Sequence, residues 1–152
     1  MKSFMQIAID QANKANLKDE VPIGAVIVMD GKVIAKSHNM TEKTNLATAH
    51  AEILAINKAC KKLNSWRLDG AEMYVTVEPC SMCAGAIANA RIKKVYFGAY
   101  EHKSGCAVSK YPILSDNGLN HTTEFEGGIE EEICANLLKN YFKQKRLKKN
   151  LD

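Results

Sequence analysis

The sequence lacks the features that mark membrane and exported proteins. No apolar run approaches the roughly 20 residues that a helix needs to cross a bilayer. The opening residues, Met1-Lys2-Ser3-Phe4, lead into neither the apolar segment nor the small-residue cleavage site of a secretory signal. We therefore expect a cytoplasmic protein without a membrane partner.

Internal repeats, low-complexity stretches and linkers rich in proline, glycine or serine are also absent. Nothing in the composition therefore divides the chain. With 152 residues, of which 46% are hydrophobic, the chain can bury one core but is short for two. The sequence predicts a single domain over residues 1–152.

The cysteine content does not indicate a disulfide framework. The chain has five cysteines, an odd number, and two of them form the closely spaced pair Cys80 and Cys83. Free thiols and thiolate ligands both suit a reducing cytoplasm.

A large excess of one charge is missing too. The net charge of +4 and the isoelectric point near 8.7 are too mild to indicate nucleic-acid binding by themselves. The distribution is more informative, because residues 139–149 contain six lysines or arginines and no acid. A solvated helix end would explain this basic segment as well as RNA contact would.

The periodicity of apolar residues predicts alternating helices and strands. Asp30-Gly31 is a strong two-residue hairpin signal between two β-branched runs. The expected elements are a helix over 4–15, strands over 23–29 and 32–36, a loop over 37–48, a helix from His50 to Lys62, a strand over 73–77, a helix from Pro79 to Ala90, a strand over 94–99, a long loop, and a helix over 129–147. This order implies an α/β layer sandwich with a mixed sheet and right-handed crossovers.

Two short segments carry the residues of a metal site, His50-Ala51-Glu52 and Glu78-Pro79-Cys80-Ser81-Met82-Cys83. One imidazole and two thiols are ligands that zinc prefers, and a catalytic zinc site keeps its fourth position open for water. Glu52 follows the histidine closely enough to handle the protons of that water. The pattern H-x-E…P-C-x-x-C is typical of zinc-dependent base deaminases.

Each half of this pattern has a simpler interpretation. A lone C-x-x-C is also found in redox dithiols and in half-sites of structural zinc, and a histidine at a helix start is often a cap. A structural zinc site needs four protein ligands. The other cysteines, Cys60, Cys106 and Cys134, have no paired spacing and are more typical of small buried hydrophobes. The joint pattern therefore favours the open, three-ligand site.

The chain resembles the cytidine/adenosine deaminase superfamily and, within it, the bacterial tRNA adenosine deaminases (the TadA family). The metal segments specify only the superfamily. The resemblance also covers the segments 20–26, 91–92 and 95–99. The finer assignment depends on the last two regions, the substrate loop at 103–105 and the closing segment with 120–121, 127–129 and 137–142. It implies a cytidine deaminase-like fold, a three-layer α/β/α sandwich around a central mixed five-stranded sheet.

The resemblance also implies an activity, the conversion of the wobble adenosine of a tRNA anticodon to inosine. His50, Cys80 and Cys83 would hold one zinc ion per chain. Glu52 would take a proton from the zinc-bound water and pass it to the purine ring, and ammonia would leave after hydroxide attacks carbon 6.

Substrate contacts follow from the same resemblance. Asn39 matches the asparagine that hydrogen-bonds the target nucleoside, although an asparagine after a strand usually satisfies a turn. Pro22 and Ile23 would wall the flipped base, or else belong to the core at the start of a strand. Phe142 would stack on a base, whereas its helical spacing alone favours the core.

The basic candidates for phosphate contacts are Lys103, Lys143, Lys145 and Arg146. Glu101 stands in the substrate loop where the family usually has aspartate, and Leu46-Ala47 replaces a common Asp-Pro before the metal helix. These departures leave the zinc ligands in place and affect substrate detail.

Two other functions stay open at this point. One is a free-base or nucleoside deaminase, acting on guanine or cytosine with the same scaffold. The other is a non-catalytic, zinc-stabilised RNA-binding module. A tRNA anticodon stem-loop as partner and a homodimer are both expected from the resemblance alone.

Overall fold

The computed structural model describes residues 1–151 of the chain. Its helices are α1 (Phe4–Leu17), α2 (Thr41–Thr44), α3 (Ala51–Leu63), α4 (Ser81–Asn89) and α5 (Glu131–Leu151). Its strands are β1 (Gly24–Met29), β2 (Lys32–His38), β3 (Glu72–Val77), β4 (Lys94–Ala99) and β5 (Glu124–Glu126). Among these residues no helix combines the length and the apolar character that spanning a membrane requires.

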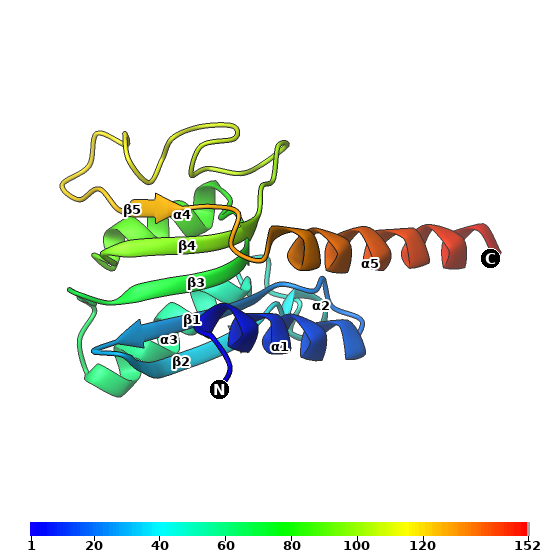
Figure 1. Cartoon of the computed structure of the whole chain (residues 1–152), viewed down its shortest axis with the longest axis horizontal. Coiled ribbons are helices and arrows are strands. Elements are labelled where there is room, and N and C mark those ends of the chain that lie inside the picture. Colours follow the sequence, from blue (N-terminus) through cyan, green and yellow to red (C-terminus); the bar gives the residue numbers. More distant parts are fainter. Residues whose placement is uncertain (152) are drawn as a thin grey trace.

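The strands form one mixed sheet in the order β2-β1-β3-β4-β5. Strand β1 is antiparallel to both of its neighbours, whereas β3, β4 and β5 run parallel. Helices α1 and α5 lie on one face of the sheet, and α3 and α4 lie on the other (Figure 1). The predicted three-layer α/β/α sandwich with a mixed five-stranded sheet is confirmed.

Each face of the sheet has its own apolar core. On the side of α3 and α4, Ile27, Met73 and Val75 pack against alanines of α3 and against Ile87 of α4. On the other side, residues of α1 and α5 pack on the sheet. Small residues allow this close approach, and a Cβ at Gly24 would collide with the backbone of α1.

The hairpin between β1 and β2 forms at the predicted turn. Asp30 and Gly31 have φ angles of 51° and 74°, and a type I′ turn requires positive φ at both of its central residues. Strand β2 runs two residues further than the predicted 32–36, to His38, so the loop expected from residue 37 begins later. This extension brings Asn39 to the end of the strand.

Three predictions from residue patterns need correction. Pro79 does not lie in the first turn of a helix, because α4 begins at Ser81 and Cys80 occupies the N-cap position. The segment expected to be a loop contains a short helix, α2. The backbone N–H groups of Glu42 and Lys43 in its first turn donate to the Glu20 carboxylate, which stabilises this helix. Strand β5 was not expected from its residues, because it is short and two of its three residues are exposed glutamates.

Candidate active site

The N-terminal ends of α3 and α4 meet on one side of the sheet. His50 is the N-cap residue of α3 and Cys80 that of α4, both with extended backbone. Neither side chain bonds to the free N–H groups of its own helix. Both are therefore free to act as ligands, while the positive ends of two helix dipoles favour thiolates at this point.

The three predicted ligand side chains come together. Nδ1 of His50 lies 3.7 Å from Sγ of Cys80 and 3.5 Å from Sγ of Cys83, and all three ligand atoms lie within 4.8 Å of one another. Zinc bonds of the usual lengths in a tetrahedral site would hold such atoms about 3.5–3.8 Å apart. The donor set and its spacing therefore fit zinc.

The two thiols of this cluster differ in acidity in the metal-free chain. A hydrogen bond with the Cys83 thiol lowers the pKa of the Cys80 thiol to about 4, and the interaction with His50 contributes in the same direction. The same thiol–thiol hydrogen bond and burial raise the pKa of Cys83. The Cys80 sulfur is therefore a thiolate at neutral pH, as a metal ligand has to be.

Glu52 lies in the first turn of α3, two residues beyond His50. Its side chain is buried, and in the metal-free chain this burial raises the pKa of the carboxyl to about 7. A group that titrates near neutral pH suits both steps of general acid–base catalysis. The geometry thus places one proton carrier beside the ligand cluster.

A cavity of about 180 Å³ opens on this cluster. It is smaller than the pockets of about 300–1,000 Å³ that enclose drug-sized ligands, and it suits a single heterocyclic base. Its walls are lined by Val21, Ile23, His50, Glu52, Val77, Glu78, Cys80, Glu101, Ser104, Leu138 and Phe142. Most of the apolar wall comes from the segment just before β1 and from α5.

The predicted substrate residues separate into two groups. Ile23, Glu101 and Phe142 line the cavity. The Phe142 ring is 45% exposed, so the core position suggested by its spacing is wrong. Pro22, Asn39, Lys103 and Arg146 are not among the lining residues; the first two are buried and the last two exposed. The binding roles of all these residues stay predictions.

Two buried carboxylates beside the site were missed by sequence reasoning. Glu20 is 1% exposed and accepts hydrogen bonds from the backbone N–H groups of Glu42 and Lys43 and from Nδ2 of Asn39. Glu78 is 2% exposed and bonds to the loop after β4. The available signal was an acid directly beside a buried apolar run, since such a charge needs partners.

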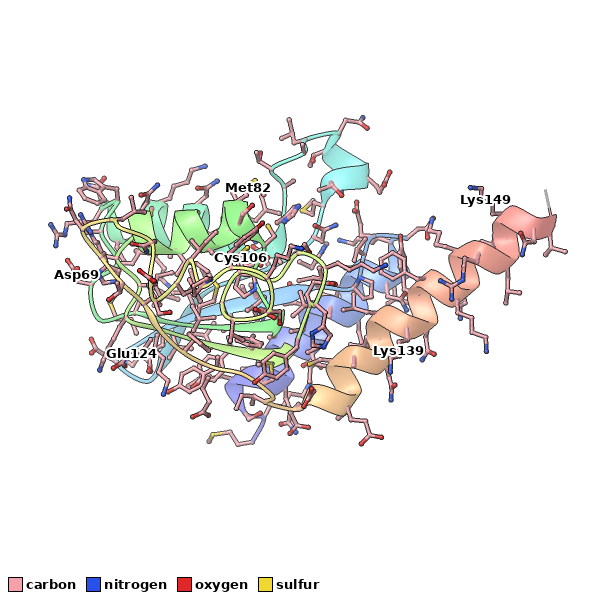
Figure 2. The ribbon with its side chains drawn as sticks, turned by 90° about the horizontal axis from the view of Figure 1, so that it is seen from above. Asp69, Met82, Cys106, Glu124, Lys139 and Lys149 are labelled. Atoms are coloured by element: carbon pink, nitrogen blue, oxygen red, sulfur yellow. The ribbon has the colours of Figure 1, made fainter. Side chains whose placement is uncertain are left out.

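Figure 2 labels Cys106, in the loop that follows β4, and Met82, at the start of α4. The N–H of Cys106 donates to the carbonyl of Pro79, directly before the first cysteine ligand. The loop is therefore tied to the same end of α4 that presents Cys80.

A family model described as MafB19-like deaminase matches residues 1–146. The tRNA-specific adenosine deaminase of Bacillus subtilis is 47% identical over 96% of this chain and 91% of its own length. The enzyme of the same name from Aquifex aeolicus is 46% identical over 94% of both chains. These alignments cover nearly the whole of each protein.

Solved structures give the same picture. One, from a study of A-to-I editing by tRNA:A34 deaminases at the wobble position of transfer RNA, superposes with a TM-score of 0.86 at 47% identity and covers 89% of this chain and 98% of the other. The guanine deaminase of Bacillus subtilis has a TM-score of 0.63 at 34% identity, over 79% of this chain and 88% of its own. The chain belongs to the MafB19-like deaminases and, within them, to the tRNA-specific adenosine deaminase family.

Proposed function

We propose that this chain converts the wobble adenosine of a tRNA anticodon to inosine, and that His50, Cys80 and Cys83 hold one zinc ion per chain. The observation that carries this proposal is a base-sized cavity whose floor combines an imidazole, a thiolate and a buried carboxylate. The near full-length similarity to tRNA-specific adenosine deaminases supports the choice of substrate.

The net reaction adds one water to carbon 6 of the purine, breaks the bond to the exocyclic nitrogen and releases ammonia. A bound zinc ion would supply the Lewis acidity that makes water nucleophilic at neutral pH. Glu52 accepts one proton of the attacking water and delivers it to the purine ring nitrogen. It then carries the second proton, from the hydroxyl added at carbon 6, to the amine, which leaves as ammonia. The burial of Glu52 raises the pKa of its carboxyl, which favours a group that both accepts and donates protons.

Other residues bind and orient the base. Ile23 and Leu138 form apolar walls that exclude bulk water from the cavity. The exposed Phe142 ring lies at the cavity and can stack on the flipped base or on its neighbour. We assign Asn39 the hydrogen bond to the nucleoside, with Pro22 behind the wall that Ile23 forms.

The RNA backbone would lie along α5. This helix projects well beyond the edge of the sheet (Figure 1), and its last turns carry exposed basic residues. We propose phosphate contacts for Lys103, Lys143 and Arg146, whose side chains are exposed. Such contacts are independent of sequence and weaken with salt.

Three further proposals concern the whole protein. One sheet shared by both cores supports a single domain over residues 1–152.

A homodimer would widen the small RNA-reading surface that one chain offers, and light scattering would measure the oligomeric state. A cytoplasmic location fits a tRNA substrate and five cysteines that are all free in the described structure.

The substrate can be identified by incubating zinc-loaded protein with an anticodon stem-loop that carries wobble adenosine and, separately, with free guanine and with free cytosine. We expect inosine in the stem-loop and no ammonia from the free bases. Ammonia from guanine but no inosine would select a free-base deaminase, which the similarity to guanine deaminase keeps as the second candidate.

The matched variant is Glu52→Gln, which keeps the shape of the side chain and removes its proton chemistry. We expect turnover to fall by about 10²–10⁴-fold while zinc content and RNA binding persist. Equal activity in wild type and variant would contradict the role of Glu52. RNA binding without turnover in the wild type would identify a zinc-stabilised binding module instead.

A further inference from the structure

The Glu78 carboxylate lines the substrate cavity, yet its own hydrogen bonds exclude it from the chemistry. Oε1 accepts from the Glu101 N–H and the Ser109 hydroxyl, and Oε2 accepts from the N–H groups of Ala107, Val108 and Ser109, at distances between 2.5 and 3.1 Å. Five donors fill both oxygens.

All five donors belong to one loop, residues 101–109, which we call the cavity loop. Two of its residues, Glu101 and Ser104, line the cavity with Glu78. Gly105 packs so closely on the Glu78 carboxylate that a Cβ at this position would collide with it. The loop is therefore wrapped around a single buried side chain.

Glu78 also connects the cavity loop to the metal cluster. Glu78 lies two residues before Cys80, and its N–H donates to the carbonyl of Ala99 at the end of β4. The same short segment that presents Cys80 thus fixes the start of the cavity loop. A rigid link of this kind lowers the cost of ordering a loop when a ligand binds.

We propose that Glu78 is a positioning residue, which holds the cavity loop against the metal-binding end of α4 so that Glu101 and Ser104 form a preorganised wall for the RNA substrate. This inference rests on the proposed function, because the wall belongs to the same cavity. It assigns Glu78 to substrate binding and leaves zinc binding and proton transfer to other residues.

The isosteric variant Glu78→Gln makes a specific prediction. The Ser109 hydroxyl can reverse and accept from the new amide, whereas the Glu101 N–H can only donate. The amide will therefore turn its NH₂ toward Ser109 and Glu101, keep its oxygen on residues 107–109, and release the Glu101 end of the loop. Amide exchange should accelerate at Glu101 more than at Ala107 to Ser109.

Steady-state kinetics on the zinc-loaded protein give the decisive readout. We expect KM for the stem-loop to rise about tenfold in Glu78→Gln, with kcat within about threefold of wild type and one zinc per chain. A rise in KM without zinc loss is not expected of a residue that only stabilises the fold. Unchanged KM, or loss of zinc together with kcat, would overturn the proposal.

Two more variants keep the test decisive. Ser109→Ala removes a single donor and should raise KM by a smaller factor, which covers the case in which Glu78→Gln fails to fold. Unchanged KM in Ser109→Ala would then overturn the proposal. Glu72→Gln is the matched control, because Glu72 begins the strand that Glu78 follows and bonds to the Tyr96 hydroxyl instead. It should leave KM, kcat and zinc unchanged.

The same variants separate this proposal from the function it rests on. If the wild type deaminates guanine and not the stem-loop, the proposed substrate is wrong, and KM for guanine then tests the cavity loop. A raised guanine KM in Glu78→Gln would support the positioning role, and an unchanged one would overturn it. If neither substrate reacts, faster exchange at Glu101 supports the role and unaltered exchange overturns it.

Discussion

The floor of the cavity and the far half of α5 carry the two sets of predicted functional residues, and they are built in opposite ways. At the floor, the side chains of His50, Cys80 and Cys83 project from the N-terminal ends of α3 and α4. Both helices pack on the same face of the sheet, and Glu52 is buried beside the three ligands. Along α5, the described structure buries only Cys134 and Tyr141. Of the basic residues beyond Phe142, all but the half-buried Lys145 are exposed, on a part of the helix that buries no side chain after Tyr141.

This difference shows where each kind of function obtains its precision. Chemistry at the floor depends on fixed distances, which burial and two packed helices supply. Phosphate recognition tolerates mobile lysines, because its energy comes largely from charge and counterion release. Substitutions at the floor should therefore abolish activity, whereas single changes on α5 should weaken binding gradually.

The largest expected effect is the loss of a metal ligand. In Cys83→Ala we expect zinc to fall below one per chain and deamination to fall at least as far as in Glu52→Gln, measured by metal analysis and inosine formation. A chelator should lower the melting temperature of the wild type, because a ligand at about 1,000 times its Kd stabilises the fold by about 4 kcal/mol. Unchanged melting with full activity in chelator would contradict a metal site at the floor.

A smaller effect is expected at Glu20, which accepts hydrogen bonds from Asn39 and from the backbone of α2. In Glu20→Gln, one amide hydrogen will face the N–H of Lys43 or Nδ2 of Asn39. The free energy of unfolding should fall by about 1–3 kcal/mol, measured by urea denaturation. The exposed Glu42→Gln in the same segment is the matched control and should stay within about 0.5 kcal/mol of wild type.

Deamination rates of Glu20 and Asn39 variants test whether Glu20 positions the Asn39 side chain. If Glu20 positions Asn39, the double variant Glu20→Gln/Asn39→Ala should be no slower than Asn39→Ala alone, since the two changes remove one function. Rate losses that simply multiply would show that the two residues act independently.

The residues that could be predicted from the sequence are those whose partners are local or whose pattern is periodic. The spacing of Cys80 and Cys83 and the hairpin at Asp30-Gly31 are local, and both were found where predicted. The bonds of Glu20 and Glu78 reach 19 to 31 residues along the chain. No local pattern reports such partners, so their roles needed the structure.

Helix α5 shows the limit of periodicity. Its spacing predicted Phe142 in the core, yet this residue is 45% exposed, and the buried residue of the first turn is Cys134. Cys134 packs so closely on Gly98 of β4 that a Cβ there would collide with its sulfur. A helix that crosses the sheet only with its first turns leaves its later apolar residues for other uses, which the pattern alone cannot separate from the core.

On α5 itself, the change Arg146→Ala should weaken binding of the stem-loop and leave kcat unchanged. Loss of one phosphate contact should reduce the slope of log K against log salt by about 0.7 for single-stranded RNA. Fluorescence anisotropy at several salt concentrations measures the slope. If Arg146→Ala abolished turnover at saturating RNA, this part of α5 would belong with the cavity floor and the comparison would fail.

The smallest effect should come from Lys145, although the sequence placed it with the other phosphate contacts. Its Nζ lies 2.9 Å from Oδ2 of Asp19 and 5.6 Å from the centre of the Tyr141 ring, so its charge is already paired. The hydrogen bond with Lys145 lowers the pKa of the Asp19 carboxyl, in agreement with this pairing. We therefore expect Lys145→Ala to change RNA affinity less than Lys143→Ala on the same helix. Equal losses would contradict this pairing, because they would mean that RNA displaces Asp19 from Lys145.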